Sequence, residues 1–253
     1  MRRIRLIVSY DGTNYCGWQI QENAVTVEGT LTDALRKWLK EDIEIIGASR
    51  TDSGVHAYGN IAVFDTNSRI PSEKFAIGLN HYLPEDIRVQ KSDEVEPDYH
   101  PRYRNTEKTY EYTILNTKIN LPIYSRYSYH VYHPLDFEAM KEAAELLVGE
   151  HDFSAFCSAG SQVKSKVRTI YEVSLDKQKV MGCNGGDLIR IRVRGNGFLY
   201  NMVRIIAGTL VEIGEGRRCL ADVKQALSTG ERKKAGPTAP PEGLVLVEIR
   251  EVP

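Results

Sequence analysis

The order in which two apolar periodicities alternate over the first hundred residues is the feature that most constrains this chain. Along residues 3–10 apolar and polar side chains alternate, and this period of two is typical of a half-buried strand that ends at Asp11 and Gly12. From Thr26 onward the apolar residues recur every three or four positions, which predicts a helix with Thr26 as its N-cap. The chain is therefore expected to begin with a strand followed by a helix.

The same patterns continue to the end of the first hundred residues. They predict strands at 43–47 and 58–65, a helix between Pro71 and Pro84, and a strand at 87–95. The resulting order, β-α-β-β-α-β, is that of a ferredoxin-like unit. Because the rest of the chain repeats this order with additions, we expect an α+β fold of two related ferredoxin-like halves, residues 1–103 and 104–253. Each half is expected to be an antiparallel sheet with helices on one face.

The composition is that of an ordinary globular protein. The chain has 253 residues, of which 42% are hydrophobic and 26% charged, so a hydrophobic core can form without disulfides or structural metal ions. No apolar run is long enough for a membrane span and the N-terminus does not resemble a secretory signal, so we expect a cytoplasmic protein. The absence of a C-x-x-C pair indicates free thiols rather than a zinc site or disulfides at Cys16, Cys157, Cys183 and Cys219.

A net charge of −1 does not by itself indicate a nucleic-acid partner, so any such partner depends on local basic clusters. Arg190, Arg192 and Arg194 alternate with apolar residues, which predicts three guanidinium groups in a row on one face of a sheet. Together with Lys164 and Arg168, this row is a candidate surface for contacting RNA phosphates. An ordinary solvated face is the alternative.

The link between the strands at 43–47 and 58–65 concentrates residues that carry chemistry. It contains an arginine, a carboxylate and a histidine, at Arg50, Asp52 and His56, in the kind of loop that commonly holds functional residues. Local features alone favour the simpler explanation that Asp52 forms a turn and His56 satisfies a local hydrogen bond.

Six strings of this sequence, in chain order, resemble patterns of the tRNA pseudouridine synthase A family. The link itself, SRTDSGVHA at 49–57, resembles G-R-T-D-A-G-V-H-A, with Ser49 and Ser53 replacing a glycine and an alanine. The other strings lie at 10–19 (Y-D-G-x-x-Y-x-G-W-Q), 79–84 (L-N-x-x-L-P), 152–156 (D-F-S-A-F), 196–204 (N-x-F-L-x-x-M-V-R) and 238–244 (T-A-P-x-x-G-L). The resemblance thus covers nearly the whole chain.

The resemblance implies an isomerase that converts uridine to pseudouridine at positions 38, 39 and 40 of the tRNA anticodon arm. It also implies a homodimer that needs no cofactor and no metal. A carboxylate suits this reaction, because it attacks as an anion near neutral pH and leaves readily, so Asp52 is the expected nucleophile. Whether Asp52 attacks C1′ of the sugar or C6 of the base stays open. Arg50 is expected either to keep the carboxylate ionised or to enter the space vacated by a flipped base, with a solvated turn arginine as the alternative.

Two further site residues follow from the resemblance. Tyr110 stands at the position of the family's active-site tyrosine, where its ring would stack on uracil and its hydroxyl would reach a proton in transit, whereas Tyr112 is assigned to the core. Arg204 interrupts the apolar run at 198–213, which predicts a helix, and a charge there requires a partner. The resemblance implies that this partner is Asp52, and a structural ion pair elsewhere is the alternative.

The main competing hypothesis is a non-catalytic RNA-binding protein built from ferredoxin-like units, with a scaffold role as a distant third. A phosphate-binding surface gains nothing from a carboxylate loop, and the aromatic signature of an RRM is absent. Gly195 and Gly197 resemble part of a dinucleotide fingerprint, but Tyr200 occupies the place of its third glycine. His130 and His133 lie three residues apart on an expected strand, a spacing that does not bring two metal ligands together, so we interpret them as structural.

Overall fold

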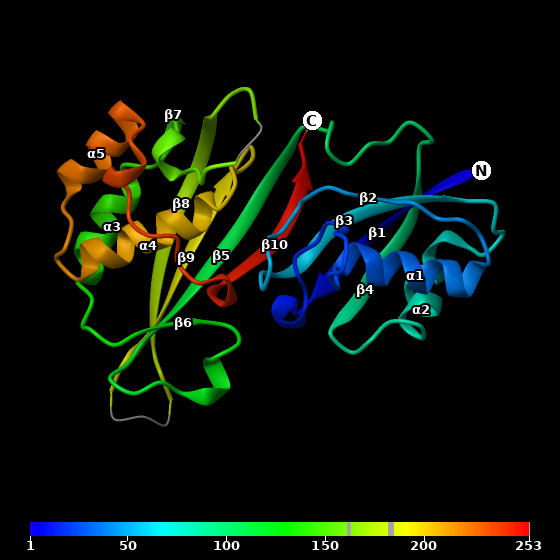
Figure 1. The fold of residues 1–253 in the computed structure, drawn as a ribbon, viewed down its shortest axis with the longest axis horizontal. Helices are drawn as coiled ribbons and strands as arrows, with labels where there is room; N and C mark the ends of the chain where they lie inside the picture. Colours follow the sequence, from blue (N-terminus) through cyan, green and yellow to red (C-terminus); the bar gives the residue numbers. More distant parts are fainter. Residues whose placement is uncertain (161–162, 182–184, 253) are drawn as a thin grey trace. The chain divides into compact units, whose positions relative to one another are not determined.

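The computed structural model describes residues 1–160, 163–181 and 185–252, so Cys183 lies outside the described residues. The chain divides into two compact units: Met1–Asn105 with Val245–Pro253 as unit 1, and Thr106–Leu244 as unit 2. Each unit combines helices with a mostly antiparallel set of strands, which confirms the expected α+β class (Figure 1). In the described part of the chain no helix is long and apolar enough to cross a membrane.

Unit 1 begins with the expected β-α-β-β-α-β order. Its elements are β1 (Arg2–Tyr10), α1 (Val27–Leu39), β2 (Ile45–Gly47), β3 (His56–Thr66), α2 (Phe75–Asn80), β4 (Ile87–Val95) and β10 (Leu244–Glu251). The strands are ordered β4-β1-β3-β10, and β2 also pairs with β3. Strand β1 is antiparallel to both neighbours, whereas β10 runs parallel to β3.

The helices of unit 1 cover one face of this sheet, as the period-two pattern of β1 requires. Ile4, Leu6 and Val8 are completely buried on that face, where Phe64 of β3 meets Phe75 of α2 edge to face with ring centroids 5.6 Å apart. The opposite face is polar and carries ion pairs such as Arg3 with Asp65. Helix α1 begins where predicted, because the Thr26 hydroxyl accepts a hydrogen bond from the Gly29 N–H.

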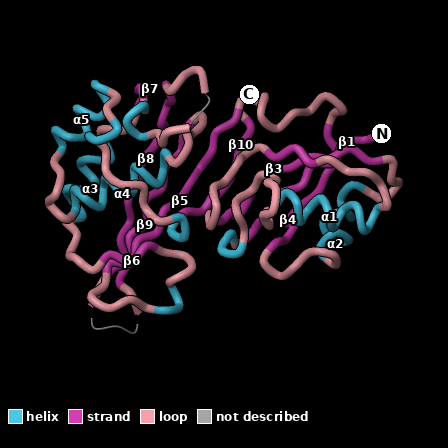
Figure 2. Tube along the Cα trace, in the orientation of Figure 1, coloured by secondary structure: helices cyan, strands magenta, loops and turns pink. Residues whose placement is uncertain are grey.

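Unit 2 has more strands than the repeated unit requires. Its elements are β5 (Thr106–Asn116), β6 (Tyr129–Val131), α3 (Phe137–Glu145), β7 (Gly149–Asp152), β8 (Val167–Lys179), β9 (Asp187–Gly195), α4 (Met202–Gly214) and α5 (Leu220–Thr229) (Figure 2). The strands are ordered β5-β9-β8-β7, with β6 also on β5. Alternate residues of β9, namely Ile189, Ile191 and Val193, are buried.

The last strand groups with unit 1, whereas the expected second half runs from residue 104 to residue 253. Val245 and Leu246 pair in parallel with His56 and Ala57 of β3, so β10 belongs to unit 1 from Val245 onward. The physical reason is that β2 pairs only with residues 62–64 of β3, which leaves the backbone groups at the start of β3 in need of a partner. Two complete ferredoxin-like halves therefore remain a prediction.

The helix expected at 198–213 begins four residues later than predicted, at Met202. Asn201, the residue before it, has a left-handed backbone conformation with φ 61°. A helix cannot continue through such a residue, because its backbone dihedrals lie outside the right-handed region. Asparagine is one of the few residues that adopt this conformation readily, so the helix start is set by one residue inside the apolar run.

Candidate active site

Asp52 lies in unit 1, in the loop between β2 and β3. It is half-buried, and its carbonyl oxygen accepts a hydrogen bond from the Val55 N–H at 3.1 Å, which closes a tight turn. Arg50 is exposed, and its Nη1 donates to the Gln19 Oε1 at 3.4 Å. Asp52 therefore forms a turn through its backbone carbonyl, and the same residue carries the carboxylate of the candidate nucleophile.

The segment that follows β1 supports this loop through backbone hydrogen bonds. The Trp18 N–H donates to the Thr51 carbonyl at 3.0 Å, and the Gly54 N–H donates to the Tyr15 carbonyl at 3.2 Å. These bonds hold the chain on both sides of Asp52. Two strings with 29 residues between them, 10–19 and 49–57, thus form one structure, which a periodicity argument does not predict.

Glycines permit the close approach of these two segments. A Cβ on Gly12 would lie 2.0 Å from the Val55 carbonyl oxygen, and one on Gly17, whose φ is +91°, would lie 2.8 Å from the Thr51 carbonyl oxygen. The Gly12 N–H also donates to His56 Nδ1 at 3.0 Å. His56 is thus hydrogen-bonded, but its partner is a distant segment of the chain rather than a local one.

Tyr110 lies in unit 2, on β5. Its side chain is buried, and its ring packs edge to face on Phe198 with centroids 5.2 Å apart. Tyr112 is completely buried, donates its hydroxyl to the Pro240 carbonyl at 2.7 Å, and has a pKa raised chiefly by burial. The assignment of Tyr112 to the core is confirmed, and Tyr110 occupies a more accessible position on the same strand face.

Arg204 lies in the first turn of α4, also in unit 2. Its Nε donates to the Ala239 carbonyl at 2.7 Å, its Nη1 donates to Asn201 Oδ1 at 2.8 Å, and its own carbonyl accepts from the Ala239 N–H. Unit 2 thereby brings the string at 196–204 against the string at 238–244. Two donors of the planar guanidinium are held, which sets its orientation.

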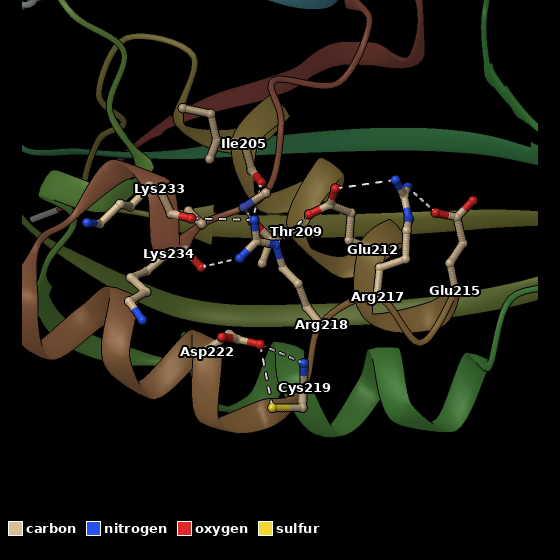
Figure 3. Close-up of polar contacts among 12 residues, drawn as sticks. Ile205, Thr209, Glu212, Glu215, Arg217, Arg218, Cys219, Asp222, Lys233 and Lys234 are labelled. Atoms are coloured by element: carbon tan, nitrogen blue, oxygen red, sulfur yellow. Dashed lines mark hydrogen bonds and ion pairs between the residues drawn. The ribbon is translucent and has the colours of Figure 1, made fainter.

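The loop that leads to Ala239 is itself anchored to α4. The Gly236 N–H donates to Thr209 Oγ1 at 2.8 Å. Figure 3 shows Arg218 donating to the Lys234 carbonyl and pairing with Glu212 of α4. The Ala239 carbonyl that accepts from Arg204 therefore belongs to a loop that is tied to α4, the helix that carries Arg204.

The arginine row is confirmed as a row on β9, but acidic side chains surround it. The ion pairs are Arg190–Glu111 (3.8 Å), Arg190–Asp176 (3.4 Å), Arg192–Glu111 (3.3 Å), Arg194–Glu107 (2.8 Å) and Arg194–Glu172 (3.4 Å). The carboxylates come from β5 and β8, the strands on either side of β9. Sequence reasoning missed them, because cross-strand neighbours depend on register.

Two further basic residues lie apart from this row. Lys164 is exposed in the segment before β8. Arg168 is half-buried, donates to the Ser165 and Val167 carbonyls, and has its pKa lowered chiefly by burial. Alternation along β8 places Arg168 on the same face as the buried Ile170.

Among the described residues, no group of three or more His, Cys, Asp or Glu side chains is placed to hold a metal ion. His130 instead contacts the Thr117 carbonyl through Nε2 at 2.8 Å, which agrees with a structural role. Cys16, Cys157 and Cys219 are free thiols, as expected.

Comparison with known proteins agrees with the six strings. A family model described as tRNA pseudouridine synthase matches residues 6–104 and 143–250. The tRNA pseudouridine synthases A of Acetivibrio thermocellus and Brevibacillus brevis are 48% and 46% identical over 249 residues, covering 98% of this chain and 99% of each relative. A chain in the crystal structure of an archaeal box H/ACA sRNP complex aligns at 10% identity and a TM-score of 0.32 over 98% of this chain and 47% of that one, which supports no conclusion. The family model and the full-length relatives show that this chain belongs to the tRNA pseudouridine synthase family of isomerases.

Proposed function

We propose that the protein converts uridine to pseudouridine at positions 38, 39 and 40 of the tRNA anticodon arm, with Asp52 as the nucleophile. The observation that carries the proposal is the loop around Asp52, which Trp18 and Tyr15 hold on both sides through backbone hydrogen bonds. A fixed backbone delivers a carboxylate in one orientation, and orientation is a large part of catalysis. Asp52 itself is half-buried on this loop.

The reaction balances with the atoms of uridine and one carboxylate. The bond between N1 and C1′ breaks, the base rotates, and a bond between C5 and C1′ forms. The proton on C5 leaves, and N1 gains a proton, so the product is an isomer of the substrate. Asp52 forms and then releases a covalent bond at C1′ or at C6, and it returns to its starting state in either case.

Three side chains have proposed roles beside Asp52. Arg50 enters the space that the flipped base vacates, which suits its exposure on the loop. Tyr110 stacks on uracil and relays a proton. Arg204 pairs with the Asp52 carboxylate, and its bonds to Asn201 and Ala239 hold the guanidinium ready for that pairing.

The tRNA backbone is proposed to contact Arg190, Arg192 and Arg194 of the row together with Lys164 and Arg168. Because the row arginines already pair with carboxylates, phosphates would exchange with these partners rather than meet unpaired charges. Exchange with the exposed Asp176 and Glu172 costs little, since surface ion pairs contribute only about 0.2–1 kcal/mol each, whereas Glu107 and Glu111 are mostly buried. We further propose that the protein acts as a homodimer, in the cytoplasm and without a cofactor.

The test is incubation of the protein with unmodified tRNA and no additive, followed by mapping of pseudouridine in the anticodon arm. We expect pseudouridine at one or more of positions 38, 39 and 40, and none with Asp52→Asn. Binding of tRNA without any pseudouridine would instead support the non-catalytic RNA-binding alternative. Formation of pseudouridine only outside the anticodon arm would overturn the proposed target.

A further inference from the structure

A buried polar network lies beneath the Asp52 loop and centres on Asn60 of β3. Asn60 is completely buried, and its Oδ1 accepts from the Ser49 N–H at 3.3 Å while its Nδ2 donates to the Ser49 carbonyl at 2.9 Å. Its Nδ2 also donates to the Tyr10 hydroxyl at 3.3 Å, and that hydroxyl shares a hydrogen bond with Thr51 Oγ1 at 2.7 Å. One amide therefore reaches both Ser49 and Thr51, the residues that flank Arg50.

The position of Asn60 is not one where sheet packing by itself favours an amide. Asparagine is depleted in strands, and Asn60 pairs opposite the completely buried Val8 in an otherwise apolar part of the sheet. Such a group is tolerated only when its hydrogen bonds are made, because a buried unpaired donor or acceptor costs about 1–3 kcal/mol. The loop backbone supplies those partners.

The backbone of β1 also adapts to this network. The register between β1 and β3 shifts between Val8 and Tyr10, at the point where β1 meets the loop. Irregularities of this kind redirect a side chain at the end of a strand. Here the redirected Tyr10 is buried, and its ring packs near Trp18 with centroids 5.8 Å apart while its hydroxyl joins Asn60 to Thr51.

We propose that Asn60 is a positioning residue for the Asp52 carboxylate. It acts by fixing the backbone N–H and carbonyl of Ser49 directly and the Thr51 side chain through Tyr10. The loop is then held from below by this neutral network and from the side by Trp18 and Tyr15. The inference rests on the proposed function of Asp52, because positioning matters for the rate only if that carboxylate reacts.

The physical consequence is an effect on rate that exceeds the effect on binding. A displacement of about 1 Å at a reacting group lowers a rate by about 10²-fold. The network touches no exposed surface, because Asn60, Tyr10 and Thr51 are all buried. Loss of the network is therefore expected to lower the single-turnover rate and to leave the affinity for the anticodon arm within about twofold.

Four variants of the full chain test this with an anticodon-arm RNA at saturating enzyme. Asn60→Asp keeps the side-chain shape and removes both Nδ2 donors. Tyr10→Phe keeps the ring packing and removes the Tyr10 hydroxyl, and Thr51→Val removes the Thr51 hydroxyl. Each of these three variants is expected to lower the rate about 10- to 100-fold. Thr51→Ser keeps the hydroxyl and loses only the methyl group, so its rate is expected to stay within about threefold of the wild type. If packing alone mattered, Thr51→Ser would lower the rate more than Thr51→Val.

Thr66→Val is the matched control for destabilisation, because Thr66 is completely buried on the same strand and donates to Glu41 far from the loop. It is expected to lower Tm like the network variants but to keep the wild-type rate. Rates within twofold of the wild type for Tyr10→Phe and Thr51→Val would overturn the inference, provided that Asp52→Asn is inactive. An active Asp52→Asn would overturn the proposed function instead, so the two failures are distinguishable.

Discussion

The Asp52 loop and the arginine row are both marked by charged residues in the sequence, yet the structure holds them in opposite ways. Asp52 sits on a loop fixed by neutral hydrogen bonds, most of them buried, to Trp18, Tyr15 and Asn60. The row is held by ion pairs between partly exposed side chains on neighbouring strands, for example Arg192 with Glu111. The first arrangement preserves a geometry, whereas the second preserves a balance of charge.

This difference has an energetic basis. A buried hydrogen bond that loses one partner costs about 1–3 kcal/mol, because the remaining group is left without water. An exposed ion pair contributes about 0.2–1 kcal/mol, and salt screens it over about 10 Å at 0.1 M. Substitutions that change the shape of the Asp52 loop should therefore lower rate and stability with little dependence on salt. Substitutions in the arginine row should instead change the salt dependence of tRNA affinity and leave the rate unchanged.

The largest expected effect is that of Asp52→Asn. The amide is nearly isosteric but cannot attack as an anion, so turnover should fall by at least about 10³-fold while tRNA affinity and Tm stay close to the wild type. Pseudouridine formation under single-turnover conditions measures this. Activity within about tenfold of the wild type would remove Asp52 from the mechanism.

Tyr110→Phe should have the next largest effect. Stacking survives and the hydroxyl is lost, so the rate should fall by about 10²-fold while binding barely changes. Tyr112→Phe is the matched control on the same strand face, because it loses only the hydrogen bond to the Pro240 carbonyl. It should lower stability and keep the rate. Equal losses of rate and binding in Tyr110→Phe would mark that residue as packing.

A change of shape at the loop should be felt next, through Gly17→Ala. The added Cβ would lie 2.8 Å from the Thr51 carbonyl in a backbone with φ +91°. We expect the free energy of unfolding in urea titrations to fall by about 1–3 kcal/mol and the single-turnover rate to fall with it. Gly160→Ala is the control, because Gly160 has φ +88° and, its chain neighbours aside, no atom of the described residues lies within 4 Å of a Cβ there. Equal destabilisation by both variants would show that the close approach is unimportant.

The smallest effects should come from the row, and they should appear as salt dependence. Arg192→Ala should flatten the slope of log affinity against log salt by about one unit, because one phosphate contact and its released counterions are lost. Glu111→Gln should raise affinity about two- to fivefold, since the amide no longer competes with phosphate for Arg190 and Arg192. Both variants should keep the single-turnover rate. An unchanged salt slope in Arg192→Ala would place the RNA path elsewhere.

Much of the fold and of the candidate site follows from sequence alone, because these features depend on local patterns. The period-two pattern of residues 3–10 predicts β1, Thr26 predicts the start of α1, and alternation along β9 predicts that three guanidinium groups share a face. The family also follows, since it rests on strings of residues that need no coordinates. The resemblance to the family also predicts Asp52, Arg50, Tyr110 and Arg204 as site residues.

Only the tertiary structure decided which distant segments meet. Asn60 is a single polar residue in a strand, and nothing in its neighbours along the chain reveals that Ser49 and Tyr10 complete its hydrogen bonds. Likewise, Glu111 pairs with Arg190 and Arg192 through the register between β5 and β9. Strand β10 pairs with β3 because the short β2 leaves part of β3 without a partner. The reason is common to all three cases. A backbone or side-chain polar group must find a partner, but chain folding rather than sequence proximity selects which partner is within reach.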